Sequence, residues 1–446
     1  MSRELAVKVL VDIFKNGAYS NIALNKCLND NHLKKCDKAF VTELVYGVLE
    51  NKERLDYVIS KFSSVKMKKI SIWILNILRV GIYQLMFMDK VPTSASVNES
   101  VKLAKRYGHI YSAKFVNGLL RKVSRDIDKI YYPDKDKEPV EYLSIWYSYP
   151  RWMVKKLLSD FGYDFAKNFL EESNKKPKFC IRVNTLKTTR DDLIDMLKQY
   201  GILANKSEVL DYGLIIENPN NITNSELYKK GYFSIQDESS MLVSSVLNPK
   251  EDDVVVDVCA APGGKTCHIA EIMKNRGVVY ARDLYQHKVD LIDSMAKRLG
   301  LSNIKTKVFD AMSIDNDLLL KADRVLVDAP CTGLGIIRRK PDIKWNKEEY
   351  DIDKISSIQY NILENAAKYL KVGGILVYST CTISREENID ILKKFLNCNK
   401  NFRMAKIDTV ESLDVDTKVD GYIELYPNVH KTDGFFIAKI MKIEKD

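Results

Sequence analysis

The chain of 446 residues is too long for one ordinary hydrophobic core, so two or three domains are expected. Hydrophobic residues make up 46% and charged residues 29%, as in soluble globular proteins, and no apolar run approaches the roughly 20 residues of a membrane span. The N-terminus resembles no signal peptide, and the eight cysteines form no Cys-x-x-Cys pair, which argues against a disulfide framework and a zinc site. We therefore expect a cytoplasmic protein that holds no metal.

The net charge of +10 belongs to the N-terminal third of the chain. Residues 1–130 hold 23 Lys and Arg against 12 Asp and Glu, a charge of +11, whereas the other 316 residues hold 47 against 48, a charge of −1. This asymmetry predicts a polyanionic partner for the N-terminal third. The alternative is that lysine serves there only as surface filler.

Residues 1–130 are predicted to be entirely helical, because apolar side chains recur at spacings of three and four. The apolar run Ile70–Met88 is interrupted by Arg79 and suits a buried central helix rather than a membrane span. Another helix is predicted over residues 95–107, after the first proline of the chain, Pro92.

A polar, proline-bounded stretch then predicts a domain boundary. We expect a linker and helical connector over residues 131–170 and a small α+β RNA-binding module over residues 171–233. Within the module the pattern predicts a strand over 179–185, a helix over 191–200 and a strand over 213–217.

Residues 234–446 alternate strictly between helical and strand patterns. This rhythm predicts an α/β domain with a doubly wound, mostly parallel sheet. The tail Gly434–Met441 is predicted to add an antiparallel strand at the edge of that sheet. The predicted helices are 238–247, 266–274, 287–299, 352–369 and 385–395. The predicted strands are 254–258, 278–282, 305–309, 324–327 and 375–378.

A loop of small residues follows the first strand of this domain. It is not a phosphate-binding Walker A loop, which would need a glycine at Cys259, and it lacks a Gly-x-Gly-x-x-Gly pattern. Small residues still let the backbone approach a ligand closely. The loop consists of Cys259, Ala260, Ala261, Pro262, Gly263, Gly264 and Lys265.

Two acidic residues end the next two strands. Asp283 is placed to bind ribose hydroxyls and Asp310 to reach an adenine edge, as in dinucleotide-binding folds. Either acid alone could be a helix cap or a plain loop residue. Their placement at successive strand ends favours a nucleoside-containing cofactor.

Two cysteines, Cys331 and Cys381, follow short β-branched runs and are therefore expected on loops at the carboxyl ends of strands. A lone free cysteine is usually an inert core residue, but two in such positions favour thiol chemistry. A thiolate that adds to C6 of a pyrimidine makes C5 nucleophilic toward a methyl sulfonium, and loss of the C5 proton then releases the thiol. The scheme also needs a group that hydrogen-bonds the ring, which Asp328 could supply, and a base or a positioned water.

Three motifs, Asp257-Val-Cys-Ala-Ala-Pro-Gly-Gly-Lys-Thr266, Asp328-Ala-Pro-Cys-Thr-Gly333 and Ser379-Thr-Cys-Thr382, resemble those of the RNA cytosine-C5 methyltransferases. The resemblance implies a Rossmann-like domain that uses S-adenosyl-L-methionine. It also implies that Cys381 is the nucleophile, that Cys331 assists product release, and that Cys259 through Lys265, Asp283, Asp310 and Asp328 contact the cofactor. Lys265 is expected near the reacting base as well.

The N-terminal third resembles the NusB-type RNA-binding helical fold, on motifs such as Gly17-Ala-Tyr-Ser-Asn21 and Phe115-Val-Asn-Gly-Leu-Leu-Arg121. Its fusion to the catalytic unit is similar to the RsmB-type branch of the family. That branch implies methylation of one cytosine of small-subunit (16S) ribosomal RNA, of the cytosine 967 type, by a monomer that binds neither DNA nor membranes. The alternatives are another rRNA or tRNA cytosine, an adenine amino group, or a non-catalytic RNA-binding factor.

Overall fold

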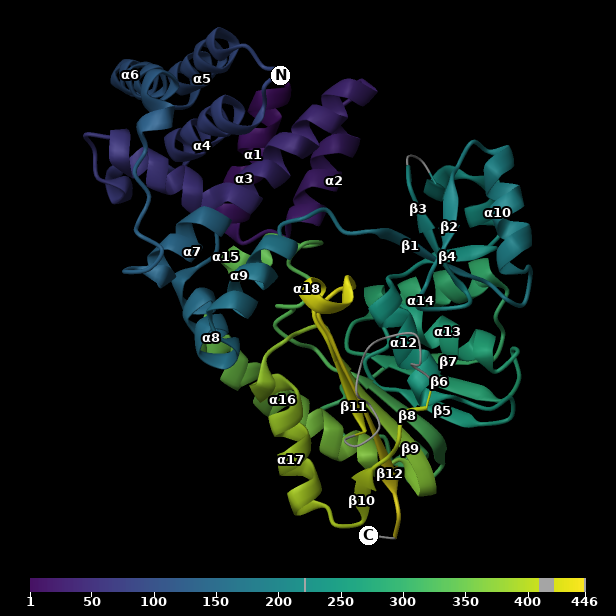
Figure 1. Cartoon of the computed structure of the whole chain (residues 1–446). Coiled ribbons are helices and arrows are strands. Elements are labelled where there is room, and N and C mark those ends of the chain that lie inside the picture. The colour runs from purple at the N-terminus through teal and green to yellow at the C-terminus, as the bar shows by residue number, and fades with distance from the viewer. Residues whose placement is uncertain (220–221, 409–420, 445–446) are drawn as a thin grey trace. The chain divides into compact units, whose positions relative to one another are not determined.

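A computed structural model of the chain describes residues 1–219, 222–408 and 421–444 (Figure 1). The chain divides into two compact units. The first unit combines Met1–Lys175 with a later segment, Ile337–Glu348, and the second combines Lys176–Ile336 with Glu349–Asp446. Within the described ranges, no helix is long and apolar enough to cross a membrane.

The first unit is helical throughout, as predicted. The predicted central helix Ile70–Met88 is α4 (Ile72–Phe87), and the helix predicted over 95–107 begins two residues earlier, at Thr93. The remaining α-helices are α1 (Ser2–Asn16), α2 (Ser20–Asp30), α3 (Lys35–Phe62), α5 (Thr93–Tyr107), α6 (Ile110–Asp126), α7 (Pro139–Tyr147), α8 (Arg151–Phe161), α9 (Tyr163–Glu172) and α15 (Ile343–Asn346).

Helix α4 is the centre of the first unit, because it packs against α1, α3, α5 and α6. Burial on most sides explains why its sequence is mainly apolar. Its one cation, Arg79, is neutralised by a bidentate pair with Asp56, at 2.7 and 2.8 Å. A β-carbon at Gly47 of α3 would collide with the ring of Tyr83, so only glycine allows this close approach of α3 to α4.

The segment Ile337–Glu348 comes from the middle of the catalytic sequence but is built into the first unit. Trp345 of α15 packs against the helical core, and its Nε1 donates to the carbonyl of Leu49 at 2.8 Å. The carboxylate of Asp342 accepts from the Ser20 hydroxyl at 2.6 Å. The chain therefore leaves the second unit after Ile336 and returns to it at Glu349.

Lys344 of the same segment is buried, with 1% of its surface exposed. Its Nζ donates to Asn174 Oδ1 at 2.8 Å and lies 3.8 Å from the centre of the Tyr149 ring. Burial lowers the pKa of Lys344 to about 7, although the carboxylate of Glu50 opposes the shift. Burial likewise raises the pKa of Glu50 to about 7, against the effect of Lys344.

We predict that Lys344 makes the stability of the protein depend on pH. Between about pH 7 and its ordinary pKa of 10.5, the unfolded chain holds more protons at this lysine than the folded chain does. Stability therefore rises with pH in that window, by up to about 1.4 kcal/mol per pH unit. Denaturant unfolding at pH 7, 8 and 9 measures this effect. The free energy of unfolding of the wild type, minus that of Lys344→Met, should increase by about 1 kcal/mol per pH unit.

The exposed Lys102, whose side chain is 72% accessible, provides the control. The stability of Lys102→Met should follow that of the wild type across the same pH range. Parallel profiles for Lys344→Met and the wild type would contradict the prediction.

The second unit begins with a small antiparallel sheet in the order β2-β3-β1-β4. The two predicted strands and the predicted helix of this module are present to within two residues. Strands β2 and β4 escaped prediction because three residues are too few to show an alternating pattern. The elements are β1 (Phe179–Val183), α10 (Arg190–Gln199), β2 (Ala204–Lys206), β3 (Gly213–Ile216), α11 (Glu226–Lys229) and β4 (Phe233–Ile235).

The large sheet of the second unit has the order β10-β12-β9-β8-β5-β6-β7, and β11 also pairs with β12. Its strands from β5 to β9 are parallel, which confirms the predicted doubly wound α/β fold. The strands are β5 (Val254–Asp257), β6 (Val278–Asp283), β7 (Ile304–Val308), β8 (Ala322–Asp328), β9 (Leu370–Thr380), β10 (Phe402–Met404), β11 (Tyr422–Leu425) and β12 (Phe435–Lys442).

The tail strand β12 is antiparallel to β9, as predicted, but its predicted place at the edge of the sheet is wrong. The short strands β10 and β11 pair with its other side and make it an interior strand. These two strands have three and four residues, which is why the sequence pattern did not reveal them.

Helices cover both faces of the large sheet (Figure 1). Alternate strand residues enter two separate cores, such as Val255 and Leu326 on one side and Val256 and Val327 on the other. The first face packs against α12 (Glu238–Leu247), α13 (Gly264–Ile272) and α14 (Gln286–Leu299), and the second against α16 (Tyr350–Ala367) and α17 (Ile389–Cys398).

The strand order reverses between β5 and β8. The chain runs from β5 through β6 to β7 on one side and then crosses to β8 and β9 on the other. In open α/β sheets, ligands bind beyond the carboxyl ends of the strands at such a switch point. The loops after β5 and β8 both start there.

Candidate active site

The loop between β5 and α13 is held by a buried acid at the end of β5, Asp257. One carboxylate oxygen accepts from the Thr266 hydroxyl at 2.7 Å, and the other accepts from the backbone N–H of Cys259 at 3.4 Å. Burial raises the pKa of Asp257 to about 7, although the bond from Thr266 opposes the shift. Gly263 has a φ of 103°, which a side chain would strain, and a β-carbon there would lie 3.1 Å from Ile292 Cα.

The two acids at the ends of β6 and β7 lie on neighbouring strands, because the N–H of Phe309 donates to the carbonyl of Asp283 at 2.9 Å. Asp283 is buried, and its Oδ2 accepts from the N–H of Ala261 at 3.1 Å. Asp310 is exposed and accepts from the N–H of Met312 at 2.9 Å. Asp283 therefore belongs to the loop's own framework, whereas Asp310 lies at the surface.

Lys265 and Asp328 form an ion pair at 2.7 Å, which links the start of α13 to the end of β8. The other oxygen of Asp328 accepts from the Ser379 hydroxyl at 2.8 Å, so β9 joins the same network. Burial alone would lower the pKa of Lys265, but the charge and hydrogen bond of Asp328, together with the Cys381 sulfur, raise it. Lys265 is therefore a fixed cation at neutral pH.

The two thiols predicted from the sequence lie in contact. Cys331 Sγ and Cys381 Sγ are 3.2 Å apart, although the residues are 50 positions apart in the chain. The hydrogen bond with Cys381, together with burial, raises the pKa of the Cys331 thiol well above its ordinary value. Positive charge lies instead near Cys381, whose sulfur is one of the groups that raise the pKa of Lys265. The arrangement favours a neutral Cys331, whereas Cys381 is the thiol that lies near the cation Lys265.

The structure thus brings Lys265, Asp328, Cys331 and Cys381 together at one edge of the sheet. The third cysteine of the motifs, Cys259, is a poor nucleophile, because burial and the charge of Asp257 raise its thiol pKa well above the ordinary value. Its backbone N–H donates to Asp257 and so helps to hold the loop between β5 and α13.

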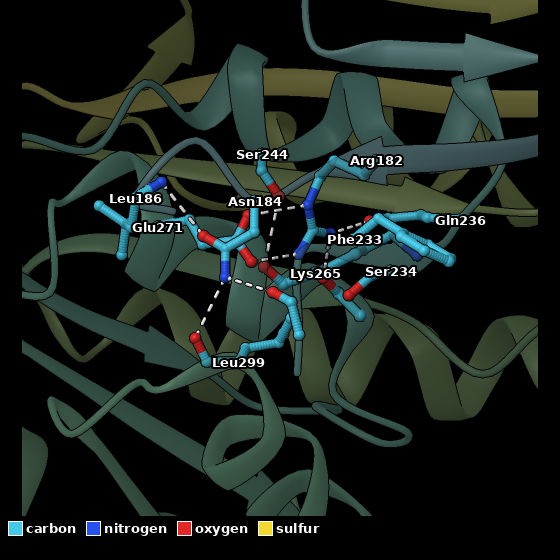
Figure 2. A network of polar contacts seen from close by, with 12 residues as sticks. Arg182, Asn184, Leu186, Phe233, Ser234, Gln236, Ser244, Lys265, Glu271 and Leu299 are labelled. Atoms are coloured by element: carbon cyan, nitrogen blue, oxygen red, sulfur yellow. Dashed lines mark hydrogen bonds and ion pairs between the residues drawn. The ribbon is translucent and has the colours of Figure 1, made fainter. Parts of the chain in front are cut away.

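A polar network from the small sheet supports the loop between β5 and α13 (Figure 2). The sequence pattern did not predict this network. Arg182 of β1 is fully buried and forms an ion pair with Glu271 of α13, at 2.9 and 3.1 Å. It also donates to the carbonyl of Gly264 at 2.9 Å and makes a very short contact with Gln236. The available signal was a charged residue in the middle of an otherwise apolar strand, which is expensive unless it is paired.

Asn184, two residues after Arg182, makes a further set of polar contacts, drawn in Figure 2. Its Nδ2 donates to the carbonyls of Gly231 and Leu299, at 2.9 and 3.1 Å. Since Leu299 ends α14 and Glu271 lies in α13, the small sheet is connected to both of these helices. Helix α13 begins at the end of the loop that follows β5.

The residues fit a nucleoside cofactor better than a metal. Only one oxygen of Asp283 is used by the loop, and the nearest cation to the other, Lys288 Nζ, is 3.7 Å away, so a ribose diol can still be accepted. Within the described part of the chain, no group of three or more His, Cys, Asp or Glu side chains is arranged to hold a metal ion.

Comparison with protein families matches three parts of the chain. The family described as 16S rRNA methyltransferase RsmB/F matches residues 244–441, and the NusB family matches residues 1–125. A ferredoxin-like domain of RsmF/B-like methyltransferases matches residues 149–223.

Relatives match over nearly the full length. The "Probable ribosomal RNA small subunit methyltransferase B" of Bacillus subtilis (strain 168) is 38% identical, over 99% of this chain and 98% of its own. The ribosomal RNA small subunit methyltransferase B of Shewanella oneidensis is 30% identical, over 99% of both chains.

Two solved structures share the fold. The crystal structure of PH0851 is 30% identical, covers 98% of this chain and 99% of its own, and has a TM-score of 0.83. That of NSun6 from Pyrococcus horikoshii with SFG, an S-adenosylmethionine analogue, is 28% identical, covers 66% of this chain and 99% of its own, and has a TM-score of 0.61.

We predict that the buried pair of Arg182 and Glu271 behaves as one unit. Arg182→Met leaves the carboxylate of Glu271 buried without its partner and should lower the free energy of unfolding by about 3–5 kcal/mol. The double variant Arg182→Met/Glu271→Leu should be more stable than either single variant, because no unpaired charge remains. Denaturant unfolding measures all three variants.

The exposed pair of Lys371 and Asp323, at 2.7 Å, is the control. Lys371→Met should cost no more than about 1 kcal/mol. Additive losses in the buried double variant would show that Arg182 and Glu271 contribute independently.

Proposed function

Because the chain belongs to the RsmB/F family of 16S rRNA methyltransferases, we propose that it methylates C5 of one cytosine in 16S rRNA, of the cytosine 967 type, with S-adenosyl-L-methionine as methyl donor. The observation that carries this proposal is the pair of thiols, 3.2 Å apart, beside a lysine–carboxylate pair. A methyltransferase that acts on an exocyclic amino group has no need of a thiol nucleophile. A non-catalytic RNA-binding factor would need neither the two thiols nor the lysine–carboxylate pair beside them.

In the proposed mechanism the sulfur of Cys381 attacks C6 of the cytosine and forms a covalent bond. The lysine–carboxylate pair of Lys265 and Asp328 hydrogen-bonds the ring and stabilises the electron density pushed into it. C5 is then nucleophilic enough to take the methyl group, which the bound cofactor supplies as a sulfonium-activated carbon. Cys331, held as a neutral thiol, assists the release of Cys381 after a base or positioned water removes the C5 proton.

The proposed cofactor contacts are the loop from Cys259 to Gly264, Lys265, Asp283, Asp310 and Asp328. The buried Asp283 is the strongest candidate for the ribose diol, because it is fixed by the loop that it helps to form. The exposed Asp310 can reach the adenine edge while it keeps the hydrogen bond that it accepts from the N–H of Met312. The backbone of the loop is a further candidate contact, and it passes close to Ile292 because Gly263 has no β-carbon.

The first unit is the proposed principal RNA-binding part, since the excess charge of +11 lies in residues 1–130. Further candidates to bind the RNA backbone lie in the segment Ile337–Glu348. They are the exposed Lys340 and the half-buried Arg338 and Arg339.

We also propose domain limits of 1–130, 131–170, 171–233 and 234–446, a cytoplasmic monomer, and no binding of DNA or membranes. Other rRNA or tRNA cytosines are the alternative substrates.

Asp283→Ala should weaken the binding of S-adenosyl-L-methionine while the binding of RNA persists. The loss of a charge-assisted contact should cost roughly 2–3 kcal/mol, an affinity loss on the order of 30- to 150-fold. Titration calorimetry measures the cofactor, and Asp290→Ala, an exposed acid on the following helix, is the matched control. Equal cofactor affinities of Asp283→Ala and the wild type would remove Asp283 from the site.

The two thiol variants should give opposite results on a denaturing gel. Cys381→Ala should lose turnover and form no covalent adduct with RNA, and cells that carry only this variant should lose one methylated cytosine in bisulfite sequencing of 16S rRNA. Cys331→Ala should still attack and methylate but stall as an RNA-linked protein. An adduct from Cys381→Ala, with none from Cys331→Ala, would reverse the two roles.

A further inference from the structure

A buried carboxylate that the mechanism does not use lies behind the two thiols. Glu387, at the end of the 3₁₀ turn Arg385–Glu387, has no exposed surface. Its Oε2 accepts from the N–H of Thr332 at 2.8 Å and from Gln359 Nε2 at 3.1 Å. Its Oε1 accepts from the hydroxyl of Thr382 at 3.2 Å and makes a very short bond with that of Thr332.

The two threonines are the residues that directly follow the two thiols. Thr332 follows Cys331 and Thr382 follows Cys381, and the two threonine hydroxyl oxygens lie 2.9 Å apart. The ladder between β8 and β9 ends before these residues, at the pair of Asp328 and Ser379. Beyond the ladder, therefore, the carboxylate of Glu387 bridges the two thiol loops.

Glu387 is itself fixed to β9. The Tyr378 hydroxyl donates to the carbonyl of Glu387 at 2.7 Å. The next residue, Asn388, accepts from the Thr380 hydroxyl at 2.6 Å and donates to the carbonyl of Thr382 at 3.1 Å. The bridge is therefore anchored in the strand that carries the Cys381 loop.

The neighbours described above all donate to the carboxylate, so the ionised form of Glu387 is the one they hold. Burial raises the pKa of Glu387, and these donors oppose the shift. After the bond with Cys381 and burial, the charge of Glu387 also raises the pKa of the Cys331 thiol. Negative charge thus lies on the Cys331 side of the thiol pair and Lys265 on the Cys381 side.

We propose that Glu387 is a positioning residue that holds the Cys331 and Cys381 loops at contact distance by bridging Thr332 and Thr382. Its effect on catalysis rests on the proposed function, whereas its effect on the spacing of the thiols does not. The two effects can therefore be measured separately.

The spacing is measured by closing a disulfide with 5,5′-dithiobis(2-nitrobenzoate). One protein thiolate displaces thionitrobenzoate from the reagent and forms a mixed disulfide, and the second protein thiolate then displaces the other thionitrobenzoate. Each protein disulfide thus consumes one reagent molecule and releases two thionitrobenzoates and two thiol protons. Peptide mass spectrometry identifies the bond between Cys331 and Cys381 and separates it from reactions of the other cysteines.

In the wild type the second displacement should follow the first rapidly, because the two sulfurs already touch. In Glu387→Ala it should slow by about tenfold or more, since a displacement on the order of 1 Å is enough to lose alignment. Asp390→Asn, which removes an exposed carboxylate three residues away, should close at the wild-type rate.

Two further variants keep the test valid if Glu387→Ala folds poorly. Thr332→Val keeps the shape of the side chain but loses the hydroxyl, and should slow the closure as well. Thr332→Ser keeps the hydroxyl and should restore the wild-type rate. Circular dichroism and thermal melting verify that each variant is folded.

The catalytic effect is read from steady-state kinetics. Glu387→Gln should lower kcat by on the order of 10- to 100-fold and leave KM for RNA and the affinity for the cofactor unchanged, because the amide presents N–H groups to partners that are themselves donors. Wild-type closure rates in folded Glu387→Ala and Thr332→Val would overturn the inference. A wild-type protein that closes its thiols rapidly but transfers no methyl group would count against the proposed function alone and would support the spacing role.

Discussion

The parallel pairing of β8 with β9 is the constraint on which the candidate active site depends. Asp328 and Ser379 are register partners at the ends of these strands, and the N–H of Ala329 continues the ladder by donating to the carbonyl of Ser379 at 2.9 Å. The loops that carry Cys331 and Cys381 therefore start at the same height along the paired strands. A slip of one residue would turn every side chain of one strand to the opposite face and would separate Asp328 from both Ser379 and Lys265.

Buried and half-buried charges around this edge connect elements that are distant in the sequence. Arg182 joins the small sheet to α13, Lys265 joins α13 to β8, and Glu387 joins the loops after β8 and β9. A buried ion pair contributes little net stability compared with apolar residues, but the loss of one partner is costly. Such pairs define the relative placement of the loops more than they stabilise the fold.

Much of this arrangement follows from local sequence. Alternation of helical and strand patterns predicts the parallel sheet, and a position directly after a β-branched run predicts which of the residues, among them Asp283, Asp328, Cys331 and Cys381, share an edge. The short strands β2, β4, β10 and β11 cannot be found in this way, and the absence of the last two from the prediction placed β12 at the edge of the sheet. Long-range partnerships such as that of Arg182 with Glu271 depend on packing between elements, which no periodicity encodes.

The same limit applies to the segment Ile337–Glu348. Its sequence pattern gives no sign that Lys344 is buried or that Trp345 packs against the core of the helical unit. A buried lysine beside an aromatic ring becomes visible only once Tyr149 and Asn174 are in place around it.

This segment also sets an order of events during synthesis. The first 175 residues emerge early, but their unit lacks α15 until residue 348 has been made, 173 residues later. At roughly 5–20 residues per second, synthesis of these residues takes about 9–35 s, and the helical unit is incomplete for that time. In that interval the part of the helical core against which Trp345 packs is uncovered, and β5 to β8 are synthesised. The N-terminal unit is therefore complete only after most strands of the parallel sheet have been synthesised, although domains usually mature in their order along the chain.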